Sequence, residues 1–327
     1  MFKRLALSLL ARPSIGRMLR PFGRGRAAVI MMHRFRTAGG NHYGHEPASL
    51  ERLLNELRAI GARFVAIEEI AAFADGSAYS QQAEPVVAFT VDDGYADFAQ
   101  VGLPIFQKFS CPVTCYVVPA VVDGRRWFWW DQLDWVARHT ALAGKTVRCI
   151  VRDFEGDLVP GSVPRLVESL KVLPTDERET LIEELARDAG VAFPETIPSA
   201  YAVMSWDAMR SVESPMVRFG AHTETHPILG RCEDDRARAE IEESCRRLQA
   251  ELRYPSPVFC YPNGMPGDFG SREWQVLKSL PGIKGAVAAV PKVARRSEAA
   301  VDPNWRWQIP RFAFDGRPGV MTRLLYL

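Results

Sequence analysis

The chain alternates between short apolar runs and longer segments whose apolar residues recur every three or four positions. The apolar runs have the length of buried strands and fall at residues 27–33, 62–67, 85–90, 112–118, 216–222, 257–262, 283–290 and 307–312. Segments such as 50–60 and 237–252 have the spacing of helices with one apolar face. Non-alternating strands that take turns with helices predict a parallel sheet covered by helices, and seven or eight such strands would close as a barrel.

This rhythm breaks between about residues 123 and 205. The stretch opens with the tryptophan-rich segment RRWFWWDQLDWV, and it later contains PTDERETLIEELARDAG, a helix with a Pro-Thr-Asp start and a Gly stop. We interpret it as a mainly helical insertion within a barrel that spans residues 27–327. A small second domain is the alternative interpretation.

Composition indicates a globular chain without a nucleic-acid partner. The 327 residues are 47% hydrophobic and 24% charged, enough for one large α/β barrel or two smaller domains. A formal net charge of +2 and the lack of a basic block argue against nucleic-acid binding. No feature of the sequence indicates an obligate protein partner.

The six cysteines predict unpaired thiols. Cys111 and Cys115 flank a predicted strand, which would hold them about 13 Å apart, too far for a disulfide. The other four show no zinc-knuckle spacing. Reduced, buried thiols are typical of a reducing compartment, so we predict a cytoplasmic location.

The amino-terminal segment 1–26 carries seven basic residues and no acidic residue. Its apolar stretch, residues 5–11, is too short to span a bilayer and is a poor secretory signal. A basic amphipathic helix resting on the inner face of the membrane and a locally packed leader both fit this pattern.

Polar residues stand where several predicted strands end. Asp92 and Asp93 follow the third run, His33 ends the first, His222 ends the run at 216–222, and Arg311 ends the segment WQIPR. The carboxyl ends of the strands of a parallel barrel meet at one rim, where active sites lie. The sequence therefore predicts that these residues form one site, although Asp-Gly at 93–94 is also a common turn dipeptide.

The segment HTETHP at 222–227 predicts a metal site, with a pair of surface histidines as the alternative. Two histidines four positions apart on one helical turn would face the same way, and Asp93 would complete a three-ligand site with open positions. Such sites serve hydrolytic metals, but the same ligand set also serves non-haem iron oxygenases. Ligand type alone therefore leaves hydrolysis and oxidation open.

Two segments resemble motifs of a known family. FTVDDG (89–94) and HTETHP resemble the first and second motifs of the polysaccharide deacetylases, the NodB homology domain of carbohydrate esterase family 4. MSWDAMRSV and FCYPNG (259–264) resemble further parts of the pattern, and the resemblance covers about 29–124 and 203–312. It implies a distorted (β/α)7 TIM-like barrel, a divalent metal, and removal of an N-linked acyl group from a sugar.

The resemblance also implies roles for individual residues. Asp92 becomes the general base, and the metal ligands become Asp93, His222 and His226. The backbone N–H of Asn263 would face the oxyanion. Zn²⁺ is the expected metal, with Fe²⁺, Co²⁺ and Ni²⁺ as alternatives.

The chain departs from the family pattern in two places. Asn263 stands where many members have an aromatic residue, and no histidine follows His226, so the usual late general acid is missing. His33 resembles an early histidine that acts as the acid in a subset of the family; a structural histidine is the alternative. Arg311 is expected either to keep Asp92 ionised or to form a purely structural ion pair.

We therefore expect a metal-dependent N-deacetylase that acts on an N-acetylated amino sugar of a polysaccharide or glycolipid precursor. Deformylation of a lipid-linked amino sugar is an alternative, and so is a catalytically inactive carbohydrate-binding relative. Iron-dependent oxygenation is less favoured, because Asp92 beside a metal ligand has a hydrolytic use and no evident oxidative one.

Overall fold

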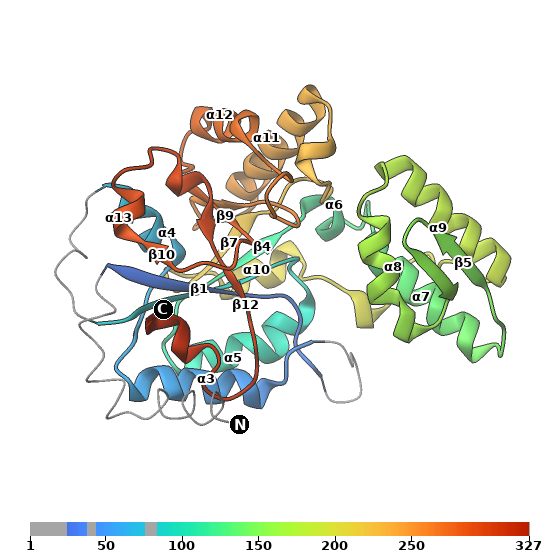
Figure 1. Cartoon of the computed structure of the whole chain (residues 1–327), viewed down its shortest axis with the longest axis horizontal. Coiled ribbons are helices and arrows are strands. Elements are labelled where there is room, and N and C mark those ends of the chain that lie inside the picture. The colour runs from blue at the N-terminus through green and yellow to red at the C-terminus, as the bar shows by residue number, and fades with distance from the viewer. Residues whose placement is uncertain (1–24, 38–43, 76–83, 327) are drawn as a thin grey trace. The chain divides into compact units, whose positions relative to one another are not determined.

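The computed structural model describes residues 25–37, 44–75 and 84–326 (Figure 1). The chain divides into two compact units, which we call the barrel unit (Met1–Val122 with Val203–Leu327) and the insertion unit (Asp123–Ala202). Residues 1–24 of the basic leader lie outside the described residues, so its contact with a membrane remains a prediction.

Most strands of the barrel unit pair in parallel. β3 pairs with β1 and β4, β4 pairs with β7, and β9 pairs with β8 and β11. Two short strands extend this arrangement: β2 lies parallel to β3, and β10 lies antiparallel to β1. The bounds are β1 (Arg26–Met32), β2 (Arg63–Phe64), β3 (Val86–Val91), β4 (Val113–Val117), β7 (Val217–Ala221), β8 (Val258–Cys260), β9 (Gly285–Ala288), β10 (Ala294–Arg295), β11 (Ile309–Pro310) and β12 (Phe312–Ala313).

The strands close into a ring. The short segment from β11 to β12 joins β9 to β1, and β7 and β8 are joined by few hydrogen bonds. β11 pairs with β9, and β12, which follows it after a single residue, pairs in parallel with β1. Between β7 and β8 the link is thinner: Ser256 donates its N–H to the Phe219 carbonyl at 2.7 Å. Glycine is needed at Gly220 of β7, because a Cβ there would lie 2.5 Å from the Tyr116 ring of β4 and 3.1 Å from the Val258 carbonyl oxygen of β8. The predicted distorted (β/α)7 barrel is confirmed.

Helices cover the strands from outside. Figure 1 shows α3 and α5 on one side of the strands and α11 and α12 on the other. The predicted helix at 50–60 is α3, which begins with a proline in its first turn and buries the four leucines of its apolar stripe. The helical segments are α3 (Pro47–Ala59), α4 (Ile67–Ala71), η2 (Ala72–Asp75), the π-helix η4 (Phe98–Gly102), α5 (Leu103–Lys108), α6 (Pro119–Val122), α10 (Trp206–Val212), η7 (Leu229–Arg231), α11 (Asp234–Glu251), α12 (Ser271–Ser279), α13 (Arg296–Ala299), η8 (Trp305–Trp307) and η9 (Thr322–Tyr326).

Strand β3 is buried on both faces, and its alternation determines where Asp92 points. Val87 and Phe89 pack in a cluster with the helix residues, whereas Ala88 packs in a second cluster with residues of β8, β9 and β11. Each fully buried large apolar side chain of this kind contributes about 1.5–3 kcal/mol. Thr90 and Asp92 continue the series of Ala88, so this strand directs a carboxylate toward the inside of the barrel.

The insertion unit has its own core. Its helices bury Leu133, Leu166 and Leu185 against one another. A hairpin, β5 paired antiparallel with β6, was not predicted; its first strand alternates exposed and buried residues within a segment that reads as polar. The elements are α7 (Trp129–Leu142), β5 (Arg148–Val151), β6 (Phe154–Asp157), η5 (Pro160–Ser162), α8 (Val163–Leu170), α9 (Thr175–Ala189) and η6 (Ser199–Tyr201).

The structure gives the state of the cysteines and the length of each described helix. All six cysteines are free thiols, and all except Cys232 are buried, as predicted. Every helix among the described residues is too short or too polar to cross a membrane.

Candidate active site

Asp92 and Arg311 form a buried ion pair at the carboxyl end of β3. Arg311 lies between β11 and β12 and donates from Nη1 to Asp92 Oδ1 at 2.7 Å and from Nη2 to Oδ2 at 2.9 Å. Burial by itself would raise the pKa of Asp92, but the adjacent guanidinium lowers that pKa to about 2. The carboxylate is therefore ionised at neutral pH.

Removing the cation of this pair should destabilise the fold. Arg311→Met leaves the Asp92 charge buried without its partner, and we expect the free energy of unfolding to fall by about 3–5 kcal/mol. Urea denaturation measures the loss. Arg317→Met, which breaks an exposed pair with Asp315, is the matched control and should change stability little. Equal losses for the two variants would contradict a structural role for the buried pair.

The next residue, Asp93, serves different partners because the chain turns sharply after Asp92. Asp93 and Gly94 both adopt left-handed backbone conformations, with φ of 72° and 70°. Aspartate tolerates this region, and glycine is needed at the second position because a Cβ on Gly94 would lie 2.7 Å from the Val117 side chain. The Asp92 carboxylate thus contacts an arginine, whereas the Asp93 carboxylate faces two histidines. This separation relieves the repulsion between the two adjacent charges.

Three side chains from two distant segments lie within 4 Å of one another. Asp93 Oδ1 lies 3.8 Å from His222 Nε2 and 3.5 Å from His226 Nε2, and the two Nε2 atoms are 3.2 Å apart. We call this group the metal triangle. The expected helical turn at HTETHP is wrong: Thr223 and His226 have φ of 64° and 63°, so a left-handed loop brings the histidines together.

The metal triangle fits a divalent cation. His222 Nδ1 must donate its proton to the Cys260 carbonyl, at 2.8 Å, so its Nε2 carries a lone pair that faces the Asp93 carboxylate. A cation between two facing acceptors satisfies both. Ligand atoms around a tetrahedral zinc lie about 3.3–3.6 Å apart, close to the observed separations.

The protonation state of the histidines also suits a metal. Burial lowers the pKa of His222 to about 4, and burial together with His222 lowers the pKa of His226 well below its ordinary value. Both imidazoles are therefore neutral at neutral pH, which is the form that binds metals.

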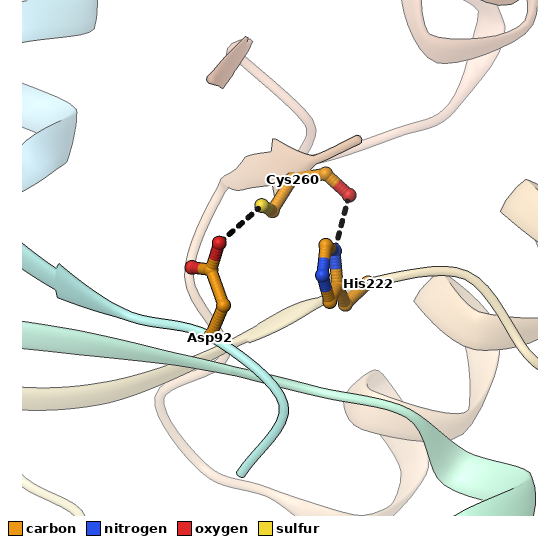
Figure 2. A group of neighbouring side chains, drawn as sticks. All are labelled: Asp92, His222 and Cys260. Atoms are coloured by element: carbon orange, nitrogen blue, oxygen red, sulfur yellow. Dashed lines mark hydrogen bonds between the residues drawn. The ribbon is translucent and has the colours of Figure 1, made fainter. Parts of the chain in front are cut away.

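A second cluster, Asp92, His222 and Cys260, is less suited to a metal (Figure 2). Both oxygens of Asp92 already accept hydrogen bonds from Arg311, and His222 Nδ1 is used by the Cys260 carbonyl. Burial raises the pKa of the Cys260 thiol well above its ordinary value, so it is protonated. The three residues of this second cluster instead hold one another in place beside the metal triangle.

Two buried carboxylates that the sequence reasoning missed anchor the site loops. Glu240 of α11 accepts hydrogen bonds from the N–H, at 2.7 Å, and from the hydroxyl of Thr225, which lies between the two histidines. Asp97 accepts from the Phe35 N–H and from Arg34 Nε, each at 3.0 Å, just after His33. Glu240 could have been recognised as an acid within the apolar stripe of its helix.

The structure brings His33 to the ion pair but does not bring the Asn263 side chain there. His33 Nε2 lies 4.0 Å from Asp92 Oδ2, and the His33 side chain is 46% exposed. The Asn263 amide instead donates to Asp268, which also accepts the Met265 N–H. Asn263 has a φ of 61°, and its backbone N–H makes no hydrogen bond to any described residue.

Similar solved structures share the fold. The deacetylase PplD of Streptococcus pyogenes, in complex with acetate, is 15% identical with a TM-score of 0.57, covering 89% of this chain and 93% of that chain. IcaB from Ammonifex degensii is 14% identical with a TM-score of 0.55, covering 93% and 99%. A de-N-acetylase from Aggregatibacter actinomycetemcomitans is 13% identical with a TM-score of 0.54, covering 92% and 100%.

A family match falls on the second half of the site. No curated protein sequence matches the chain. The sequence model of the family described as polysaccharide deacetylase matches residues 182–281, which contain His222, His226 and the segment FCYPNG. The chain therefore resembles the polysaccharide deacetylases over these residues, and it shares the barrel fold of the similar solved structures.

Proposed function

We propose that this protein is a metal-dependent hydrolase that removes N-acetyl groups from amino sugars of a polysaccharide or a glycolipid precursor. One observation carries the proposal: Asp93, His222 and His226 place three ligand atoms 3.2–3.8 Å apart, beside an ionised Asp92. The similar solved structures include a deacetylase in complex with acetate and a de-N-acetylase, and both support the same reaction.

Zinc is the metal that we propose for the metal triangle. Two imidazoles and one carboxylate leave a further position open, as in catalytic zinc sites. A cation bound there supplies a Lewis acid that acidifies water and polarises the amide carbonyl. Fe²⁺, Co²⁺ and Ni²⁺ accept the same ligands, so reconstitution with each metal decides between them.

The residues of the chain would move the protons. Asp92, kept ionised by Arg311, accepts the proton of the attacking water. The free N–H of Asn263 donates to the oxygen on which negative charge develops. His33, on the exposed side of Asp92, donates a proton to the departing amine.

Replacing His33 tests its role as the acid. We expect His33→Gln to lower kcat on an N-acetylated sugar by about 10²-fold or more, because the amine leaves poorly without a proton. An aryl acetate with a good leaving group needs no such proton, so its hydrolysis should change much less. Rates on both substrates provide the measurement. Equal losses on both, or no loss, would favour a structural histidine.

The function itself is tested by product analysis. Purified protein is incubated with N-acetylated glycans, N-acetylated glycolipids and lipid-linked N-formyl sugars, with a chelator or with added zinc or iron. We expect acetate release that the chelator abolishes and zinc restores. Formate release alone would replace the proposal with deformylation, and dioxygen consumption with iron would replace it with oxidation. Sugar binding without acyl release under any condition would refute the hydrolase.

A further inference from the structure

The guanidinium of Arg311 is buried with each of its hydrogens matched to an acceptor. Arg311 is 1% exposed. Its five N–H groups face five acceptors: Ala288 O from Nε, Thr90 Oγ1 and Asp92 Oδ1 from Nη1, and Asp92 Oδ2 and Cys260 Sγ from Nη2. The sulfur of Cys260, 3.1 Å from Nη2, is therefore the fifth acceptor.

The same thiol also reaches the carboxylate. Cys260 Sγ lies 3.6 Å from Asp92 Oδ2, so the S–H donates to the oxygen that Arg311 also contacts (Figure 2). Cys260 is fully buried at the end of β8, which leaves water no access to replace either contact. Its backbone carbonyl accepts from His222 Nδ1, so one residue contacts both the ion pair and a member of the metal triangle.

We propose that Cys260 is a positioning residue that fixes the Asp92–Arg311 pair for proton transfer through the polar contacts of its thiol. This inference rests on the proposed function of Asp92. Without the thiol, one buried N–H of the Arg311 guanidinium loses its acceptor and the Asp92 carboxylate loses one donor. The pair can then rotate away from its present geometry. The thiol needs no ionisation and no oxidation for this role.

Three substitutions separate polarity from volume. Serine keeps a donor and an acceptor but is smaller than cysteine, valine fills the volume with one additional methyl group and no polar group, and alanine keeps neither. We expect Cys260→Ser to retain kcat within about threefold, and Cys260→Ala and Cys260→Val to lower kcat about tenfold or more with KM and metal content unchanged. If volume alone mattered, Cys260→Val would be the active variant, and that order would overturn the proposal.

Cys115 of β4 is the matched control. It is as buried as Cys260, but its side chain packs in an apolar cluster, and its polar contact is with the backbone of Gly94 and not with the ion pair. There, Cys115→Val should leave kcat unchanged and preserve the melting temperature better than Cys115→Ser, the reverse of the order of activity at Cys260. If the same replacement, serine or valine, were the better one at both positions, the effects would indicate general packing and contradict a positioning role.

Crystal structures of the three Cys260 variants judge the inference even if the parent releases no acyl group. We expect Asp92 and Arg311 to keep their geometry in Cys260→Ser and to shift in the alanine and valine variants. An unmoved pair in all three variants would refute the positioning role. An inactive parent with these shifts would instead refute the proposed function while leaving the position of Cys260 supported.

Discussion

Asp92→Asn is expected to lower turnover by about 10³-fold or more while the protein still binds one metal ion. The amide cannot accept the proton of the attacking water, and its NH₂ group faces an arginine that needs an acceptor. Metal binding should persist, because the ligand atoms of the metal triangle come from Asp93, His222 and His226. Turnover and metal content of the same preparation provide the measurement.

The control for this variant must separate catalysis from stability, because Asp92→Asn also leaves Arg311 without its charge partner. Asp134→Asn, in the insertion unit, removes another buried aspartate that is paired with an arginine, Arg138. We expect it to lose stability but keep turnover. Full turnover in Asp92→Asn, or loss of metal from a folded Asp92→Asn protein, would show that the two adjacent aspartates have been given the wrong roles.

His226→Gln is expected to weaken metal binding by about 10²-fold or more and to abolish turnover at ordinary metal concentrations. The variant removes one of three ligand atoms, whereas the loss of outer contacts alone already costs about 10–100-fold in affinity. Isothermal titration calorimetry with the metal measures the change in affinity. Chelator-treated parent protein should lose activity in the same way and regain it when zinc is added.

His45→Gln is the matched control for the ligand variant. The His45 ring packs against Phe35 and Phe314, with ring centres 6.3 and 4.8 Å apart, and belongs to neither cluster of the site. Its replacement should leave metal affinity unchanged. Equal weakening in the two variants would indicate a general effect of losing a histidine from the barrel unit.

The strands and the meeting of the site residues could be predicted because their signals are local. Apolar runs such as that of β3 reveal buried strands, and a polar residue at the end of a parallel strand is placed at the rim by the fold itself. The shape of the histidine loop was less accessible. Thr223 and His226 adopt left-handed backbone conformations, which cannot be predicted from their residue types. H-x-x-x-H was therefore interpreted as a helical turn.

The role of Cys260 could not be predicted because its partners are remote in sequence. Asp92 lies 168 positions away and Arg311 lies 51 positions away, and no spacing rule connects the three. The Asn263 side chain is a local case, since its partner Asp268 lies only five positions along the chain. Glu240, by contrast, interrupts an apolar stripe, and such a buried acid requires a partner.

Anomalous diffraction from crystals of the zinc-loaded protein tests the metal triangle most directly. We expect a single zinc peak about 2.0–2.2 Å from Asp93 Oδ1, His222 Nε2 and His226 Nε2. A peak among Asp92, His222 and Cys260, or a folded protein that binds no zinc at its three-ligand site, would contradict this expectation.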